Sequence, residues 1–444
     1  MGILETTKQY VKDFMDGVGR NGKRDKLARM SAGTYVRTPA LELNSLYAEN
    51  RIIQNVVDIP AEDMTRNWFS FRCENDKLGQ NIMSKLADLN AKDVFKRMMM
   101  YDRIQGDGFI SIGVTQSEKF ELKEPLNEKG LFSVDYLHAF SSMKVREFLM
   151  NEDVFDIGYG QLELLRIDRS SKHTTAPVLS DAEVHTSRLL HARTRWLEGE
   201  VQGQSLIETM NDVFKVFDTT LWSVGQILYD YTFKVYKSKD IDGMDSKDKQ
   251  ELSMLMDFMF RTEAMAIIAD GEELTKQGTN VSGIDQLINF VWDVMAASAR
   301  MPKTVLKGQE SGTIAGAQYD VMNYYARIAA DQENILKPLI ERLIRLIMLS
   351  QKDVGDRVDP DSLEWEIKFN PLWQVDSKTD AEIRKLIAET DQIYIVNGVH
   401  TVDDVRKARF GQFGLTEENK YSGDSADLDD LARQAYKGWL DDKA

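Results

Sequence analysis

The sequence of 444 residues contains a single cysteine, Cys73, and only five histidines. One thiol cannot form an intramolecular disulfide or a thiolate metal cluster, and Cys73 in the strand-like stretch 68–73 is interpreted as a buried structural thiol. The histidines are scattered without the spacing of a metal site. No apolar run approaches the ~18 residues that span a membrane, and residues 1–8 lack the features of a signal peptide. These absences predict a soluble chain made in the cytoplasm, with no metal, no cofactor and no membrane contact.

Positive charge is also scarce, because 56 Lys and Arg face 72 Asp and Glu and the net charge is -16. Such a surface repels phosphate backbones on average. It argues against a protein that grips nucleic acid over a broad face, and it leaves open a local basic loop or a channel that does not hold DNA tightly. With 42% hydrophobic and 29% charged residues, the composition is that of a globular chain. The length corresponds to roughly three domains.

The hydrophobic pattern of the first half predicts an α+β fold that is mainly helical. Residues 1–40 are predicted to be a flexible arm. Apolar residues at helical spacing predict two packed helices over residues 41–66, the second opened by Pro60, and one more helix over 90–104. Short alternating runs between 106 and 200, including 155–159 and 161–167, predict strands without βαβ regularity.

The pattern changes after Gly203. Residues 204–230 are predicted to form one long helix, and 284–299 a second one. Between them, residues 231–279 have the pattern of a compact module of strand, helix, strand and strand. Pro302 then ends the second helix, and a polar segment follows that we interpret as a mobile loop.

A helical pattern of some 35 residues runs over residues 315–349, roughly 50 Å at about 1.5 Å per residue. Pro338 lies inside it and is predicted to kink the helix, because its ring clashes with the carbonyl of Asn334. A strand over 363–369 and helices over 380–390 and 401–409 follow. Residues 416–444 are predicted to be a polar C-terminal tail.

Two apparent ligand motifs fail on inspection. The stretch GVGRNGKR at residues 17–24 resembles a phosphate-binding loop, but no buried strand precedes it and Arg24 stands where a Ser or Thr would hold magnesium. The acidic stretch 240–245 has its glycine at the fourth position of a calcium loop rather than the sixth. We therefore assign no catalytic residue.

The order of the elements between residues 204 and 349 resembles the central part of bacteriophage portal proteins. Short motifs in the family's order and spacing agree with this resemblance over residues 40–410. They are LY at 46–47, IIQNVVDIP at 52–60, DMTR at 63–66, RMPKTVLKG at 300–308, NYY at 323–325, ILKPLIE at 335–341, LEW at 363–365 and FNPL at 369–372.

The resemblance implies a portal-like division of the chain into wing, stem and clip, with a long kinked helix. The first part of the wing would be residues 41–203, and the long helix would lie in its second part, 316–415. Two stem helices, 204–230 and 280–299, would flank a clip domain at 231–279. Residues 300–315 would be the tunnel loop.

In function, the resemblance implies a conduit and not an enzyme. Portal proteins of this family form a ring, usually a dodecamer, at one capsid vertex of the virion, and they are assembled in the host cytoplasm. Double-stranded DNA passes through the ring during packaging and ejection. The partners implied are further copies of the chain, the terminase large subunit, a head-tail connector or adaptor, and the major capsid and scaffold proteins.

The tunnel loop is the DNA-contacting site that the resemblance implies, since a few cations on a flexible loop can touch phosphates transiently. Its residues in this sequence are Lys303, Lys307, Gly308, Ser311 and Gly312. Three alternatives remain at this stage: an ordinary connector between helices with solvated lysines, an enzyme whose carboxylate-based site is not visible in one sequence, and another ring component of the virion.

Overall fold

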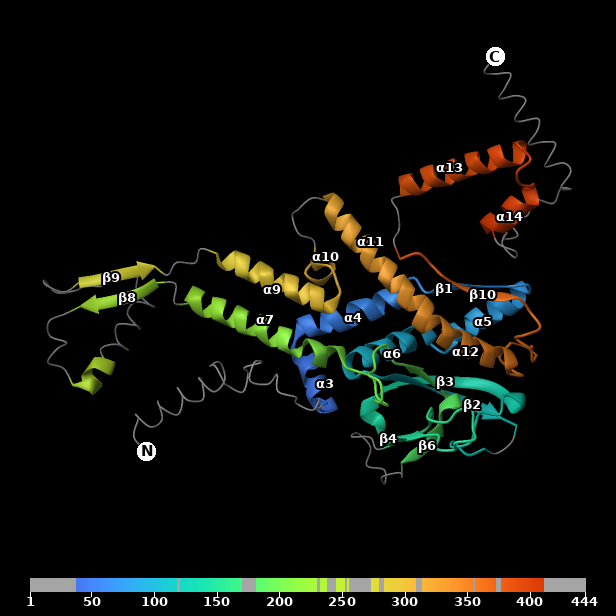
Figure 1. The fold of residues 1–444 in the computed structure, drawn as a ribbon, viewed down its shortest axis with the longest axis horizontal. Coiled ribbons are helices and arrows are strands. Elements are labelled where there is room, and N and C mark those ends of the chain that lie inside the picture. The colour runs from blue at the N-terminus through green and yellow to red at the C-terminus, as the bar shows by residue number, and fades with distance from the viewer. Residues whose placement is uncertain are drawn as a thin grey trace, which may run out of the picture.

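The computed structural model describes residues 37–117, 120–169, 181–229, 232–237, 245–251, 254, 273–278, 283–308, 314–354, 356–372 and 377–410. A body of helices and small antiparallel sheets occupies one end, and a pair of long helices projects from it (Figure 1). The fold is thus mixed and mainly helical, as predicted. Residues 1–36 of the predicted arm and the tail at 416–444 lie outside the described residues, as do parts of the predicted 231–279 module. The last part of the predicted arm, residues 37–40, is not flexible, because Arg37 and Thr38 are hydrogen-bonded to Gly203 and Glu208 and α3 begins at Ala40.

The body begins with α3 (Ala40–Glu49) and α4 (Arg51–Arg66). We expected Pro60 to open the second helix, and this was wrong, because the chain breaks at Asn50. The Asn50 side chain caps α4 by accepting hydrogen bonds from the amides of Ile52 and Ile53. Pro60 lies inside α4, where the carbonyl of Val56 loses its helical partner. Arg103 replaces that partner, since its Nη2 donates to the Val56 oxygen at 2.8 Å.

Helix α6 (Ala91–Gln105) packs in the middle of the body, against α4, α5 (Asp76–Asp88) and the strands that follow it. Its apolar side chains Phe95, Met98 and Met99 are fully buried. Strand β1 (Phe69–Cys73) pairs antiparallel with β10 (Trp365–Phe369), which is distant in sequence. This pairing joins the N-terminal and C-terminal segments of the body. Cys73 is buried and its Sγ donates to the carbonyl of Asn75 at 2.9 Å. Burial raises its thiol pKa, so the structural interpretation of this cysteine holds.

The three-stranded antiparallel sheet β3-β2-β7 packs against α6, and a second such sheet, β4-β5-β6, packs against the first. A small second core, built on Phe109, Phe140 and Leu165, joins them. The predicted run 155–159 is not a strand, because Asn151, Asp153 and Asp156 bind nearby amides in successive turns. The bounds are β2 (Gly108–Gln116), β3 (Leu131–Ser141), β4 (Val145–Met150), β5 (Leu162–Ile167), β6 (Ala182–His185) and β7 (Leu189–Ala192), with short 3-10 turns at Glu128–Gly130, Ser142–Lys144 and Thr186–Arg188.

The projecting pair consists of α7 (Leu206–Tyr229) and α9 (Ile284–Ala299), which pack against each other. Both helices were predicted from the apolar spacing. The antiparallel strands β8 (Thr232–Lys237) and β9 (Glu273–Gly278) pair at the far end, as far from the body as any described element (Figure 1).

After α9, a helical turn α10 (Lys303–Leu306) leads toward α11 (Ile314–Asp331). Helix α11 passes through a π-helical turn (Gln332–Leu336) into α12 (Lys337–Leu349). In the π turn, the amide of Lys337 donates to the carbonyl of Gln332, five residues earlier. This irregular turn directly precedes Pro338, whose ring is incompatible with the regular hydrogen bond to Asn334.

The described chain ends with α13 (Ser377–Val396) and α14 (Val402–Phe410). They lie beside the body and are drawn red in Figure 1. Over the described residues, every helix is too short or too polar to cross a bilayer.

Candidate functional site

The predicted tunnel loop begins with a tight reversal at the end of α9. Arg300 takes a left-handed conformation with φ 54°, and the amide of Met301 donates to the carbonyl of Ala296 at 3.0 Å. Met301 is buried, and Pro302 in an extended conformation starts α10. The loop therefore leaves α9 from a fixed point in the core.

The side chains of the two predicted DNA-contacting lysines both contact residues of α9. Lys303 Nζ lies 2.6 Å from Oδ1 of Asp293, and the Lys303 side chain is only 23% exposed. Lys307 is exposed, and its Nζ lies 5.8 Å from the centre of the Trp292 ring. Trp292 in turn packs edge-on against Phe217 of α7 at 4.8 Å. Both cations are thus held beside the projecting helices.

Residues 303–306 were expected to be loop and are a helical turn instead. Leu306 is buried and Val305 packs against the main core, so this turn is anchored by apolar side chains that a polar loop would lack. Gly308 is exposed, with φ 96° and open space around it. A residue with a side chain would be strained at that φ, so glycine suits the point where the chain turns away. Ser311 and Gly312 lie outside the described residues.

The π turn brings a side chain into the core that sequence reasoning missed. Gln332 is 1% exposed, and its Nε2 donates to the carbonyl of Met64 at 2.7 Å, near the end of α4. Close by, the Tyr324 hydroxyl donates to Asp63 at 3.0 Å, and Asp63 pairs with Arg66. Burial raises the pKa of Asp63 against the opposing effect of these partners. These contacts fix the long helix on α4.

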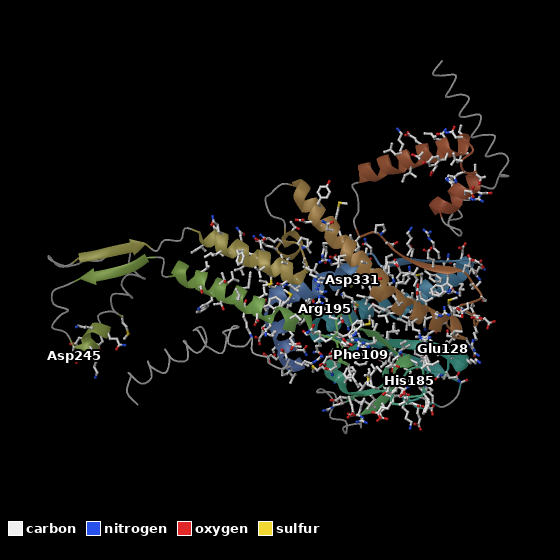
Figure 2. All side chains as sticks on the ribbon, viewed as in Figure 1. Phe109, Glu128, His185, Arg195, Asp245 and Asp331 are labelled. Carbon is white, nitrogen blue, oxygen red and sulfur yellow. The ribbon has the colours of Figure 1, made fainter. Side chains whose placement is uncertain are left out.

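Four arginines surround Asp331 at the end of α11: Arg103, Arg195, Arg300 and Arg327. Figure 2 shows Arg195 and Asp331 together near the C-terminal end of α9. In the described part of the chain, no guanidinium lies within ion-pair distance of the Asp331 carboxylate, and the four act on it at longer range. Burial raises the pKa of Asp331, and the arginines oppose this effect. We call Asp331 and these four arginines the junction cluster.

Two buried carboxylates on the other side of Arg103 hold the start of α7. Asp102 accepts from the amide of Thr194 at 2.9 Å and from its hydroxyl at 2.7 Å. Asp107 contacts His191 at 2.8 Å and accepts from the amide of Gly203 at 2.8 Å. Burial raises the pKa of Asp102 to about 7. Because each carboxylate is occupied by neighbouring protein groups, their geometry is that of structural anchors rather than of an acid-base pair.

Gly106 and Gly203 make this anchoring possible, because their backbones touch. A Cβ on Gly203 would lie 1.8 Å from the carbonyl oxygen of Gly106, and one on Gly106 would lie 2.2 Å from that of Gly203. Neither position tolerates a side chain without a backbone shift. The change of pattern seen at Gly203 in the sequence therefore marks a close approach of two backbone segments.

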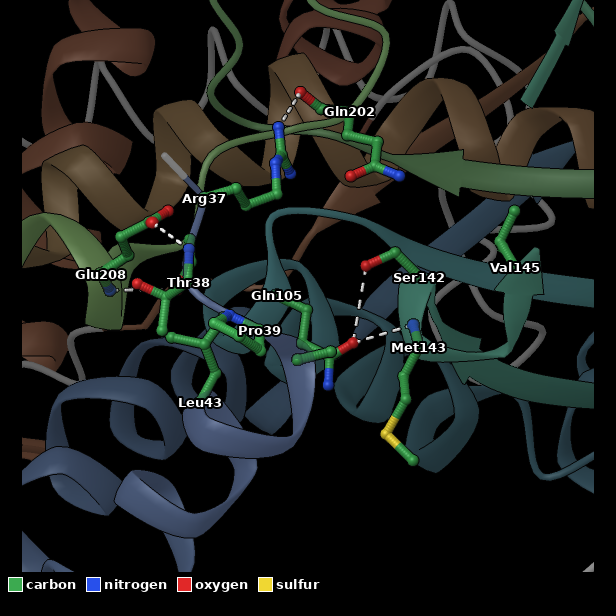
Figure 3. Close-up of a pocket in the computed structure, with 12 residues that line it drawn as sticks. Arg37, Thr38, Pro39, Leu43, Gln105, Ser142, Met143, Val145, Gln202 and Glu208 are labelled. Atoms are coloured by element: carbon green, nitrogen blue, oxygen red, sulfur yellow. Dashed lines mark hydrogen bonds between the residues drawn. The ribbon is translucent and has the colours of Figure 1, made fainter. Parts of the chain in front are cut away.

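A cavity of about 300 Å³ opens between the start of α3 and the root of α7. Figure 3 shows that its polar groups bind one another. Arg37 donates to the carbonyl of Gln202, the amide of Thr38 donates to Glu208, and Gln105 accepts from the amide of Met143. The hydrogen bonds of Arg37 and Thr38 hold the segment before α3 against the start of α7. Over the described residues, no group of three or more His, Cys, Asp or Glu side chains is placed to hold a metal ion.

Curated relatives match this chain at low identity over most of its length. An uncharacterized protein of Haemophilus influenzae is 23% identical over 87% of this chain and 88% of its own. Two proteins named Anti-CBASS protein Acb1 match as well. The one from Caulobacter sp. is 21% identical over 78% of this chain, and the one from Sphingomonas paeninsulae is 23% identical over 93%. The matches span 57% and 67% of the length of these two relatives.

Two solved structures with a similar fold are a chain from a gene transfer agent particle and a phage portal protein. The neck of a native gene transfer agent (GTA) particle, computed with C12 symmetry, has a chain 14% identical to this one, with a TM-score of 0.47, covering 86% of this chain and 96% of that one. A HK97 family phage portal protein from Corynebacterium diphtheriae is 9% identical, with a TM-score of 0.39, over 77% and 97% of the two chains.

The family comparison covers the parts of the chain described above, from α3 through the projecting helices to α13. The family described as "Phage portal protein" matches residues 41–393, which is most of the 444 residues. This range agrees with the resemblance that the short motifs indicated over residues 40–410. The chain therefore belongs to the phage portal protein family.

Proposed function

We propose that this chain is the subunit of a portal ring, a dodecamer at one capsid vertex of a phage virion. In this proposal the ring conducts double-stranded DNA during packaging and ejection. It is assembled in the host cytoplasm with the major capsid and scaffold proteins, and it has no catalytic role. Helices α7 and α9 form the stem, β8 and β9 belong to the clip, residues 300–315 with α10 form the tunnel loop, and residues 41–203 and 316–415 form the wing.

The observation that carries the proposal is the lack of a core in the outer half of the α7–α9 pair. Among the described side chains, the last one buried on α7 is Phe217 and the first on α9 is Met295. Within the described side chains between these points, to Gly225 on α7 and from Ile284 on α9, none is buried. Large apolar side chains are exposed there instead: Leu221 (46%), Trp222 (70%), Leu287 (64%) and Phe290 (63%).

Two helices with exposed apolar side chains need a further partner, because such surfaces are unstable in water. In a ring, the same pair from each neighbouring copy supplies that partner. A heterologous contact of this kind closes into a ring when the rotation between copies allows it. The family membership makes a portal ring the natural assembly.

For DNA, Lys307 is the more exposed of the two cations of the proposed tunnel loop. Lys307 and Gly308 are exposed, whereas the Lys303 side chain is 23% exposed. A single exposed ammonium per subunit makes weak contacts with phosphates that salt screens, which suits a channel through which DNA moves. Lys303 then sets the position of the loop. Ser311 and Gly312 remain proposed members of it.

The far end of the stem is the proposed docking platform for the terminase large subunit and later for the head-tail connector or adaptor. This assignment rests on the position of β8 and β9, which lie at the end of the projecting pair (Figure 1). A strand edge that is not paired within its own chain can pair with another chain.

The proposal is tested by measuring the mass of the purified chain in solution and by imaging it with electron microscopy. The expected result is a ring of about twelve subunits with a central hole. A Trp222→Ser, Phe290→Ser variant should remain folded and lose the ring, whereas Phe155→Ser, on an exposed turn of the body, should keep it. A small closed oligomer without a channel would favour an enzyme or another kind of virion component.

A further inference from the structure

The junction cluster carries more positive charge than the described chain neutralises. Its four arginines face two carboxylates, Asp331 and the nearby Asp102, and Asp102 is only partly ionised at neutral pH. Arg103 is buried, and its Nε has no hydrogen-bond partner in the described part of the chain. Buried or half-buried cations without matched anions destabilise a fold, so over the described residues the charges of Arg103 and Arg195 are not fully balanced.

The cluster is reachable from outside. Arg300 and Arg327 are exposed, while Arg195 is half-buried behind them. Arg327 Nη1 donates to the carbonyl of Arg300 at 2.8 Å, which holds α11 against the end of α9. In the described part of the chain, neither Arg195 nor Arg300 makes a side-chain hydrogen bond or an ion pair. Over the residues that the structure describes, their donors are therefore available to an incoming anion.

Two large apolar side chains are exposed on α11, one to two turns before Arg327. They are Tyr319 and Met322, which are 69% and 49% exposed. Arginine beside exposed aromatic and thioether side chains is the composition of a protein interface. A surface that met only a hydrated phosphate backbone would have no use for this apolar area.

We infer that the junction cluster, with Tyr319 and Met322, receives a carboxylate-bearing face of a second copy of this chain. The charge balance supports this occupant, since each copy carries 16 more carboxylates than cationic side chains. Planar guanidiniums bind carboxylates in a bidentate manner and lose less entropy in doing so than lysines do. The inference rests on the proposed ring and adds to the stem contact a polar contact at the junction of stem and wing.

The test measures how assembly depends on subunit concentration for the full chain and for an Arg300→Gln, Arg327→Gln variant, by mass photometry at 0.1 M and 1 M NaCl. Since both side chains are exposed, the variant should keep the circular dichroism of the monomer, with only a small fall in melting temperature from the lost hydrogen bond between Arg327 and the Arg300 carbonyl. We expect its half-assembly concentration to rise at least about tenfold at low salt, with a weaker salt dependence than wild type. Arg345→Gln on α12, whose arginine pairs with Asp361, is the matched control and should assemble as wild type.

The outcomes separate this inference from the proposed ring. Equal assembly of the variant and the wild type would overturn the inference and leave the ring intact. Equal assembly combined with loss of duplex DNA binding would overturn it in favour of a phosphate ligand. If the wild-type chain formed no oligomer at any concentration in solution and no ring in phage particles, both the inference and the proposed ring would be overturned.

Discussion

Lys303 Nζ lies 2.6 Å from Asp293 Oδ1, so the first cation of the proposed tunnel loop is bound to the proposed stem. The pair joins α10 to α9 across the reversal at Arg300 and Pro302. It is partly exposed, and such pairs contribute little to stability, about 0.2–1 kcal/mol. Its value lies in fixing where the loop begins.

Removing this pair and removing the exposed cation should therefore have different effects. Lys307→Ala should reduce DNA packaging or retention while leaving ring formation intact. Lys303→Ala and Asp293→Asn should resemble each other, because both release the start of the loop. Packaging assays with purified procapsids would compare the three variants, and Lys303→Ala with Lys307→Ala should show the strongest defect. Normal packaging by the double variant would remove both lysines from the site.

Arg103 and Pro60 should be energetically coupled. Arg103→Met leaves the Val56 carbonyl buried without a partner, and we expect a loss of about 1–3 kcal/mol in the free energy of unfolding. In a Pro60→Ala background the new amide can donate to Val56, so the same change should cost less. Denaturant unfolding of the four chains in this double-mutant cycle measures the coupling. Additive effects would show that Arg103 does not substitute for the amide that proline lacks.

Pro338→Ala should allow the π turn to return to a regular helix. Gln332 would then rotate by about 100° and lose its hydrogen bond to Met64, since one residue of an α-helix turns by that angle. The long helix α11–α12 would shift relative to α4, with altered ring geometry in electron microscopy. Hydrogen exchange over residues 332–336 gives a second readout. Unchanged subunit packing and exchange would show that proline does not set this irregularity.

Asp102 should make stability depend on pH. Its pKa rises from 3.8 to about 7 on folding, because burial disfavours the charged form. The folded state therefore binds more protons than the unfolded state between these values, and stability should fall as pH rises from about 4 to about 7. One group changes the free energy of unfolding by at most about 1.4 kcal/mol per pH unit.

Asp102→Asn should flatten that part of the profile, because the amide does not titrate. Asp88→Asn at the end of α5 changes the net charge equally and serves as the control. Thermal unfolding between pH 4 and 8 compares the three chains. A wild-type slope that persists in Asp102→Asn would assign the pH dependence to other groups.

Sequence reasoning located the elements whose pattern is local. The apolar spacing over residues 284–299 gave α9 with both ends correct, and the strand predicted at residues 363–369 overlaps β10. It misplaced the break between α3 and α4, because the capping by Asn50 decides that boundary and a distant arginine makes Pro60 acceptable inside the helix. Helix propensity alone does not predict the hydrogen bond from Arg103 to the Val56 carbonyl.

The candidate site was only partly predictable for the same reason. The glycines and lysines of 303–312 are visible as a polar segment, but the pairing of Lys303 with Asp293 depends on the reversal between α9 and α10. The junction cluster was invisible, since Arg103, Arg195, Arg300 and Asp331 are far apart in sequence. They meet only when α6, α9, α11 and the segment after β7 pack together.

The central claim is that this chain forms a ring with a channel, and single-particle electron microscopy of the purified chain, with its mass measured in parallel, tests it most directly. Our account predicts closed rings of about a dozen subunits, with the α7–α9 pairs packed side by side around the hole and Trp222 and Phe290 buried between copies. Compact particles without a channel, or rings in which these two side chains stay exposed to solvent, would contradict it.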